Sequence, residues 1–177
     1  MIRPRGRPVE VDLSARVGAR AWHHHGMRGS PLAATLGPTI AAAVLGNLVV
    51  PKAAVEWFRA LRQPRMAIPF PAFVAVGLVY YGLIAVVRHR ALVRADRRAA
   101  RLTLVVLGLN EGWNAAFLGR RSTRNGFVGM VLFAVPVLAL QRAVHDDRVS
   151  RATLAPYTAW VLAYDLPWSY RLWRLNS

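Results

Sequence analysis

Long intervals without ionisable side chains divide this sequence of 177 residues. Five intervals, each bounded by basic residues, follow one another along the chain: 29–51, 66–87, 102–119, 125–141 and 152–170. The first, second and fourth contain no Asp, Glu, Lys or Arg, the third contains only Glu111, and the fifth contains only Asp165. A helix needs about 20 apolar residues, with a range of about 17 to 25, to cross a hydrocarbon core of about 30 Å. The pattern therefore predicts five transmembrane helices.

A soluble helical bundle is the alternative fold, and its helices would carry charges every three or four residues along a solvated face. The stretch 70–87, FPAFVAVGLVYYGLIAVV, is instead apolar all round. The net charge of +16 comes from Arg residues that separate the apolar intervals, where their side chains can extend to lipid headgroups. A nucleic-acid partner is not expected, because its site would gather these charges into one patch. We expect an all-α fold, a five-transmembrane-helix bundle in a lipid bilayer.

Residues 1–30 form a basic segment ahead of the transmembrane domain, residues 31–177. This segment contains six Arg and three adjacent His, His23–His25, but lacks the apolar core of a signal peptide. We interpret it as a disordered basic N-terminal extension. Fifteen Lys and Arg fall on the side of the N-terminus and nine on the other side, which favours a cytoplasmic N-terminus. We expect an integral protein of a bacterial-type cytoplasmic membrane.

Four sequence blocks, in order, resemble one membrane protein family. Residues 57–69 read W-F-x-x-L-x-x-P-x-M-x-x-P, and F-x-x-V at 73–76 and Tyr81-Gly82 follow without a gap. The third interval contains L-N-x-x-W-N-x-x-F-L-G at 109–119, and the fifth contains P-Y-x-A-W-V at 156–161. These blocks resemble the tryptophan-rich sensory protein family, also called the translocator protein or TspO/MBR family. The resemblance extends over residues 51–176.

The resemblance implies a protein that binds a hydrophobic small molecule as a sensor, scavenger or transporter. The implied ligand is a porphyrin-like tetrapyrrole, either a porphyrin or haem, and no cofactor is required. Gly77 stands where the family usually has a Trp associated with the ligand pocket and with light-dependent porphyrin breakdown. Gly77 therefore argues against the alternative of a tetrapyrrole-degrading enzyme. A structural membrane protein that binds a partner protein is the other alternative.

The third interval, drawn as a helix, separates two faces. The first face gathers polar and aromatic side chains that suit a ligand: Asn110, Trp113, Asn114 and Phe117. The opposite face gathers small residues: Gly108, Gly112, Ala115 and Gly119, with Ala116 at its edge. Small residues four positions apart let two membrane helices approach closely, and the resemblance implies a homodimer through this face. The alternative for both faces is packing within one bundle, with the amides bonding neighbouring helices.

Aromatic residues in other intervals extend the predicted ligand site. Tyr81 belongs to the second interval, and Trp160 and Tyr164 lie one helical turn apart in the fifth. Such side chains suit a flat, largely apolar ligand with a few polar edges. Trp57 either covers the cavity, as the resemblance implies, or lies at the lipid headgroups. A separate aromatic belt is predicted at the membrane surface near the end of the fifth interval: Trp168, Tyr170 and Trp173.

The two isolated acids receive different interpretations. An ionised Glu111 near the middle of a membrane span costs at least about 2 to 3 kcal/mol, so it must be paired, hydrated or protonated. We expect it to form a polar contact between helices or subunits rather than to bind ligand, and we expect Asp165 to meet Arg171 near the surface. We name no catalytic residue and no metal ligand, because the sequence contains neither a phosphate-binding glycine loop nor H-x-x-x-H nor G-x-S-x-G.

Overall fold

The computed structural model describes residues 30–48 and 51–177, and every regular element within them is helical. The elements in chain order are α1 (Pro31–Leu48), α2 (Lys52–Ala60), α3 (Phe70–Val93), α4 (Arg97–Asn114), η2 (Ala115–Gly119), α5 (Thr123–Ala143), α6 (Arg148–Trp160), η3 (Val161–Asp165) and α7 (Leu166–Leu175). The short π-helical turn η2 continues α4, and a second π-helical turn, η3, joins α6 to α7. The predicted all-α class is confirmed. The predicted extension, residues 1–30, lies outside the described residues except for Ser30.

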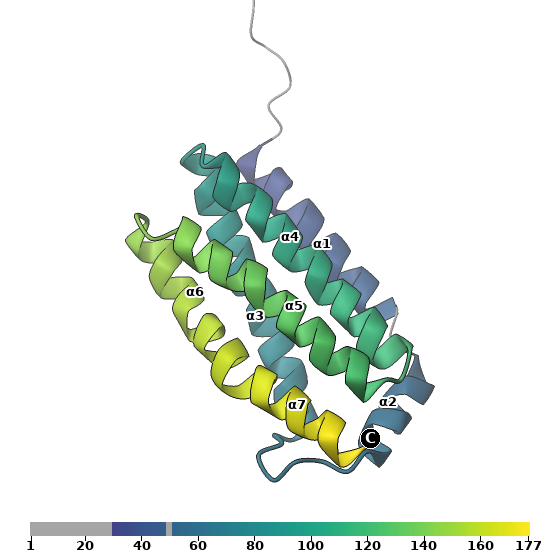
Figure 1. Ribbon diagram of the computed structural model, residues 1–177. Helices are drawn as coiled ribbons and strands as arrows, with labels where there is room; N and C mark the ends of the chain where they lie inside the picture. Colours follow the sequence, from purple (N-terminus) through teal and green to yellow (C-terminus); the bar gives the residue numbers. More distant parts are fainter. Residues whose placement is uncertain (1–29, 49–50) are drawn as a thin grey trace, which may run out of the picture.

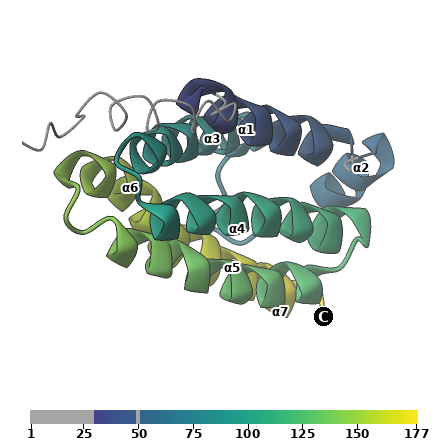
Figure 2. The same cartoon turned by 90° about the horizontal axis from the view of Figure 1, so that it is seen from above.

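Five long helical rods run alongside one another, and each rod corresponds to one of the five apolar intervals of the sequence (Figure 1). The rods are α1, α3, α4 with η2, α5, and the continuous run α6–η3–α7. The start of α1 and the turns 94–96 and 144–147 lie at one end of the bundle, whereas α2, the turn 120–122 and the C-terminus lie at the other (Figure 1). Figure 2, the view from above, shows α2 beyond the end of α1. Successive rods therefore alternate in direction.

Two helix starts are fixed by side-chain caps. The Asp96 carboxylate accepts a hydrogen bond of 2.9 Å from the backbone N–H of Ala99, at the start of α4. The Ser122 hydroxyl accepts one of 3.2 Å from the backbone N–H of Asn125, at the start of α5. These contacts satisfy backbone donors that have no partner within the helix. Both caps come directly after a turn in a left-handed conformation, at Ala95 (φ 57°) and Arg121 (φ 49°).

Arg88 ties three rods together at the end of the bundle that holds the turn 94–96. Its side chain donates from Nε to the carbonyl of Ala34 in α1 at 3.0 Å. Its Nη1 donates to the carbonyl of Ala100 at 2.7 Å and to the Thr103 hydroxyl at 3.2 Å, both in α4. Arg88 is only 7% exposed. The sequence-based expectation that such Arg side chains extend to headgroups is wrong for Arg88, because backbone carbonyls inside the bundle satisfy its guanidinium.

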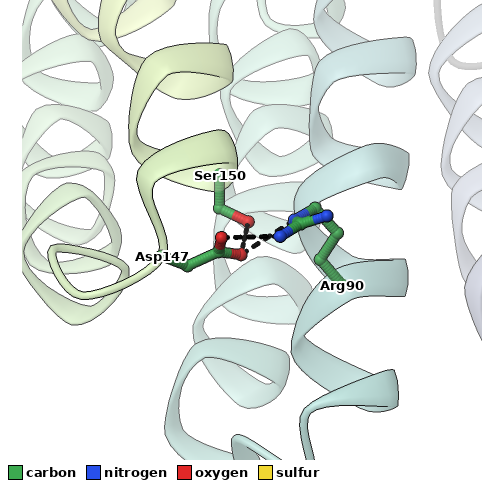
Figure 3. Close-up of polar contacts among 3 residues, drawn as sticks. All are labelled: Arg90, Asp147 and Ser150. Carbon is green, nitrogen blue, oxygen red and sulfur yellow. Dashed lines mark hydrogen bonds and ion pairs between the residues drawn. The ribbon is translucent and has the colours of Figure 1, made fainter.

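An ion pair joins α3 to the turn before α6 at the same end (Figure 3). Arg90 donates from Nε to Asp147 Oδ2 at 2.9 Å and from Nη2 to Asp147 Oδ1 at 2.7 Å. The Ser150 hydroxyl donates to Asp147 Oδ2 at 2.6 Å. The hydrogen bonds from Arg90 and Ser150 lower the pKa of the Asp147 carboxyl well below its usual range. This bidentate ion pair between Arg90 and Asp147 fixes the turn 144–147 against α3.

An aromatic core fills the opposite end of the bundle, where α2 lies. Phe58 of α2 packs 5.9 Å from Phe117 and 6.1 Å from Trp168, measured between ring centroids. Phe73 lies 5.7 Å from Trp168. Trp168 is 2% exposed, so the predicted position in a surface belt is wrong for this residue, because its ring packs among those of α2, α3 and η2. Tyr170 is exposed.

Apolar side chains also cover much of the outside of the bundle. Within the described residues, α3 and α5 are long and apolar enough to cross a membrane. Only 17% of the most apolar window of α3 is buried, whereas the core helix of a soluble protein would be mostly buried. Leu78 on α3 and Val135 on α5 are 65% and 64% exposed. These outward faces are suited to contact with lipid hydrocarbon.

Candidate ligand cavity

A cavity of about 390 Å³ opens between α3, α4, α5 and the α6–η3 rod. Its size falls within the range of about 300 to 1,000 Å³ that is usual for small-molecule sites. Gly46 of α1 and Val55 of α2 complete its wall. Aromatic side chains make up much of the surface: Phe70, Phe73, Tyr80, Tyr81, Trp113, Phe133, Tyr157 and Trp160. The sequence predicted a site shared by the second, third and fifth intervals, and these are the helices that meet here.

Five of the eight predicted ligand residues line this cavity: Tyr81, Asn110, Trp113, Asn114 and Trp160. The other three lie outside the lining. Phe117 is 1% exposed and belongs to the aromatic core. Trp57 packs edge to face on Phe117, with ring centroids 5.6 Å apart. The Tyr164 ring lies against the Trp160 ring, with centroids 4.3 Å apart, and its hydroxyl accepts a hydrogen bond from the backbone N–H of Ile68.

A polar cluster centred on Glu111 lies beside the cavity. The Tyr81 hydroxyl of α3 donates to Glu111 Oε1 at 2.6 Å, and Asn110 Nδ2 donates to the same oxygen at 3.0 Å. Asn114 Nδ2 donates to Glu111 Oε2 at 3.2 Å. Glu111 therefore forms a polar contact between α4 and α3, as predicted, and both Asn side chains take part in it. Their amide nitrogens are used within the bundle.

Gly46 of α1 gives this cluster the space it needs. A Cβ atom at position 46 would overlap Glu111 Oε2 and would lie 3.2 Å from the Tyr81 hydroxyl. Only a glycine lets the backbone of α1 approach the carboxylate this closely. The cluster thus fixes the spacing of α1, α3 and α4.

The Trp113 ring is held rigidly as part of the cavity wall. Its indole Nε1 donates to the carbonyl of Gly126 in α5 at 2.8 Å. A Cβ atom at Gly129, one turn further along α5, would lie 2.9 Å from Trp113 Cδ1. Helix α5 therefore presents glycine where the tryptophan ring packs against it. A ring fixed in this way presents a preformed flat surface to a ligand.

Gly77 leaves open space in the cavity wall. A Cβ atom at this position would meet no atom within 4 Å among the described residues. Phe73, Gly77 and Tyr80 all line the cavity and stand at positions i, i+4 and i+7 of α3. This spacing on one helix face is visible in the sequence and could have identified Phe73 and Tyr80 as lining residues. The resemblance included Phe73 among its matching residues, but neither Phe73 nor Tyr80 was predicted to bind ligand.

Asp165 also lines the cavity and is only 7% exposed. Its Oδ1 accepts a hydrogen bond of 3.0 Å from the indole Nε1 of Trp160. The predicted contact with Arg171 is wrong, since Arg171 Nη1 instead lies 3.2 Å from the sulfur of Met66. Asp165 faces the cavity because it lies in the π-helical turn η3, in which hydrogen bonds join residues i and i+5. That geometry brings Asp165 onto the same side of the rod as Trp160.

The turn η2 changes the helix register in the same way. Its bonds include Arg120 N–H to the Ala115 carbonyl at 3.1 Å, again five residues apart. Phe117 consequently rotates into the aromatic core, and Leu118 takes its place at the cavity. A helical wheel drawn with α-helical spacing places Phe117 on the ligand face. The π turn accounts for this difference of one residue.

A comparison with known protein families matches most of the chain. A model described as the TspO/MBR family matches residues 34–173. The chain belongs to the TspO/MBR family. The match includes every residue that lines the cavity, and it confirms the resemblance seen in the sequence. No curated protein matches the chain.

The small-residue face of this TspO/MBR protein is exposed at three of its five positions. Gly108 and Gly112 are exposed, and a Cβ atom at either would meet no described atom within 4 Å. Gly119 is also exposed, whereas Ala115 and Ala116 are half-buried. Among the described residues, no other helix of the bundle packs against Gly108 or Gly112, and packing within one bundle was the alternative that the sequence left open.

No group of three potential metal ligands occurs within residues 30–48 and 51–177.

Proposed function

We propose that this TspO/MBR protein spans the lipid bilayer five times and binds a hydrophobic small molecule in the cavity. The proposed ligand is a porphyrin-like tetrapyrrole, and the protein acts as a sensor, scavenger or transporter for it. The observation that carries the proposal is the cavity itself, with its aromatic walls and its amide edge at Asn110 and Asn114. Its helices come from separate parts of the chain, which is a usual arrangement for a site between the helices of a bundle.

The chemistry of the cavity supports a flat aromatic ligand. Trp113, which is 7% exposed, and Trp160 contribute apolar ring atoms to the lining from different helices, and their N–H groups are already hydrogen-bonded to Gly126 and Asp165. A ring system bound between them gains stacking contacts and loses few polar contacts with water. The open space at Gly77 enlarges the same wall. No nucleophile or metal site takes part in this proposal, which is one of binding rather than catalysis.

The experiment is a titration of the detergent-solubilised protein with protoporphyrin, followed by tryptophan fluorescence. We expect saturable quenching that weakens in Trp160→Phe and in Asn110→Ala, because both residues line the cavity. Trp173→Phe is the matched control: it also removes one indole, but from a residue outside the cavity lining. Quenching that does not saturate, or that is equally strong in all four proteins, would overturn the proposal.

The same proposal includes a homodimer through α4. The exposed positions Gly108 and Gly112 lie one turn apart on that helix, with no described side chain against them. Two such faces can approach until backbone atoms touch, which strengthens van der Waals contact in a bilayer. The ligand cavity lies on the other face of α4, at Asn110 and Asn114. Dimerisation therefore leaves this wall of the cavity unchanged.

A further inference from the structure

The cavity is acidic, although the protein as a whole is strongly basic. The chain carries 24 basic residues and only 8 acidic ones, for a net charge of +16. Two of the eight acids are at the cavity: Asp165 lines it, and Glu111 bonds to three of the residues that line it. Among the described residues, no Lys, Arg or His lines the cavity. Any charge that these acidic side chains contribute to the cavity is therefore negative.

Hydrogen-bond acceptors are among the polar atoms left for a ligand, together with the hydroxyl of Tyr157, which also lines the cavity. The hydroxyl of Tyr80 donates to the carbonyl of Val106 at 3.2 Å, and that of Tyr81 donates to Glu111. The Trp113 and Trp160 N–H groups are likewise occupied. Because Asn110 and Asn114 turn their nitrogens toward Glu111, their carbonyl oxygens accept no hydrogen bond from any described residue. A ligand that donates hydrogen bonds complements these atoms.

The Asp165 carboxylate has one partner in the described part of the chain, the indole of Trp160. A single neutral donor does not offset the cost of keeping a buried carboxylate ionised, which requires a cation or several hydrogen bonds. Described basic side chains do not supply the cation: Arg171, on the same rod, contacts Met66 instead. The cavity is the space from which a positive group can reach Asp165.

We propose that this cavity also binds ligands that carry a protonated amine, which pairs with Asp165. The aromatic walls support the same cation, because the faces of Trp and Tyr rings attract ammonium groups. This inference rests on the cavity of the proposed function and adds to its tetrapyrrole a second class of ligand, apolar ring systems that bear a cationic nitrogen. Carboxylate groups, such as those of protoporphyrin, then stay at the open side of the cavity and away from Asp165.

A matched pair of probes tests this inference. 1-Naphthylmethylamine is cationic at pH 7, and 1-naphthalenemethanol is neutral and nearly identical in shape. Isothermal titration calorimetry in a neutral detergent compares their dissociation constants for the full-length protein. We expect the amine to bind about tenfold more tightly than the alcohol, the size of effect expected of one charge-assisted hydrogen bond. Equal affinities would overturn the inference.

Asp165→Asn identifies the carboxylate responsible. This variant keeps the shape of the side chain, so the alcohol should bind with unchanged affinity while the advantage of the amine disappears. Asp146→Asn is the matched control, because the Asp146 side chain is 80% exposed in the turn 144–147, outside the cavity. This control should keep the full preference for the amine. A preference that survives in Asp165→Asn also overturns the inference.

The two proposals fail in different ways. Saturable protoporphyrin binding without any preference for the amine, or without binding of either naphthalene, overturns the amine inference and leaves the proposed function in place. Absence of binding by protoporphyrin and by both naphthalenes overturns the proposed function and, with it, the amine inference.

Discussion

Single side chains decide how polar groups are accommodated inside this bundle. Glu111 accepts hydrogen bonds from Tyr81, Asn110 and Asn114, and each of these donors lines the cavity. The carboxylate therefore orients the polar edge of the site without lining it. Asp165 has one hydrogen-bond partner among the described residues, Trp160, and lines the cavity. The two acids near the middle of the bundle thus have different roles.

Removal of the Glu111 carboxylate should destabilise the protein. Glu111→Ala leaves three donors without their acceptor, and a lost hydrogen bond to a charged group costs about 2 kcal/mol. Denaturation in mixed micelles measures the free energy of unfolding. Glu56→Ala, at an exposed position on α2, should change it by less than about 0.5 kcal/mol. Equal effects of the two substitutions would show that the cluster contributes no stability.

The open space at Gly77 predicts a steric effect on binding. In Gly77→Leu the new side chain enters the cavity, and we expect protoporphyrin affinity to fall by about tenfold or more. Gly82→Leu is the matched control on the same helix, because Gly82 is equally free of described neighbours but does not line the cavity. The fluorescence titration measures both affinities. Unchanged affinity in Gly77→Leu would place the ligand elsewhere.

Residue patterns in the sequence predicted part of the site and missed part of it. Asn110, Trp113 and Asn114 precede the π turn η2, and α-helical spacing places them correctly on the cavity face. Phe117 and Asp165 lie within π turns, where each turn holds about one extra residue and rotates the side chains that follow. Nothing in the local composition of 115–119 or 161–165 marks such a turn. Their positions therefore required the structure.

At the scale of helices, two kinds of contact hold the rods together. Polar ties occur near one end of the bundle, at Arg88 and at the Arg90–Asp147 pair. Aromatic packing fills the other end, around Phe58 and Trp168. The cavity is lined by side chains from the helices that these contacts position. Changes at the polar end should therefore affect stability more than ligand binding.

The Arg90–Asp147 pair predicts a dependence of stability on pH. The pKa of the Asp147 carboxyl is lowered in the folded state. The carboxylate therefore stabilises the fold above about pH 3.9, the usual Asp pKa, and this stabilisation is lost as the pH falls below that value. Asp147→Asn should reduce the fall in melting temperature between pH 5 and pH 2. Asp146→Asn should leave it as in the wild type. If the melting temperature of Asp147→Asn fell between pH 5 and pH 2 as much as that of the wild type, the pair would contribute no stability.

The small-residue face of α4 predicts the oligomeric state. Gly112→Leu places a large side chain where two helices would meet, so we expect monomers in chemical crosslinking and in light scattering of the detergent-solubilised protein. Gly82→Leu, on an exposed face of α3, should stay dimeric. Protoporphyrin binding should be retained in both proteins. A dimer that persists in Gly112→Leu would exclude this face as the interface.

At the scale of the whole molecule, the apolar outer surface of the bundle is suited to contact with lipid. The sequence predicted five helices from five intervals that hold at most one ionisable residue each, and the structure forms one helical rod from each interval. Their order and central segments could be predicted because the cost of placing charge in hydrocarbon confines ionisable residues to helix ends. Helices α3, α4 and α6 extend beyond the intervals into the flanking basic residues. The cavity could not be predicted from the same pattern, because its shape depends on how the rods pack. Helices α3 and α5 provide the clearest membrane-crossing segments.

Labelling of single cysteines tests the proposed topology. The chain contains no Cys, so each introduced thiol is unique. With a cytoplasmic N-terminus and five spans, Gln63→Cys lies outside the cell and His145→Cys inside it, and both positions are exposed. A membrane-impermeant maleimide should label Gln63→Cys in intact cells and His145→Cys only after permeabilisation. The reverse result would invert the orientation, and labelling of both in intact cells would exclude five spans.

The most direct test of the central claim is an experimental structure of the protein in lipid nanodiscs with saturating protoporphyrin. The account predicts ligand density in the cavity between α3, α4 and the α6–η3 rod, in contact with Trp113 and Trp160. An empty cavity in a structure with ligand density elsewhere on the protein would contradict it.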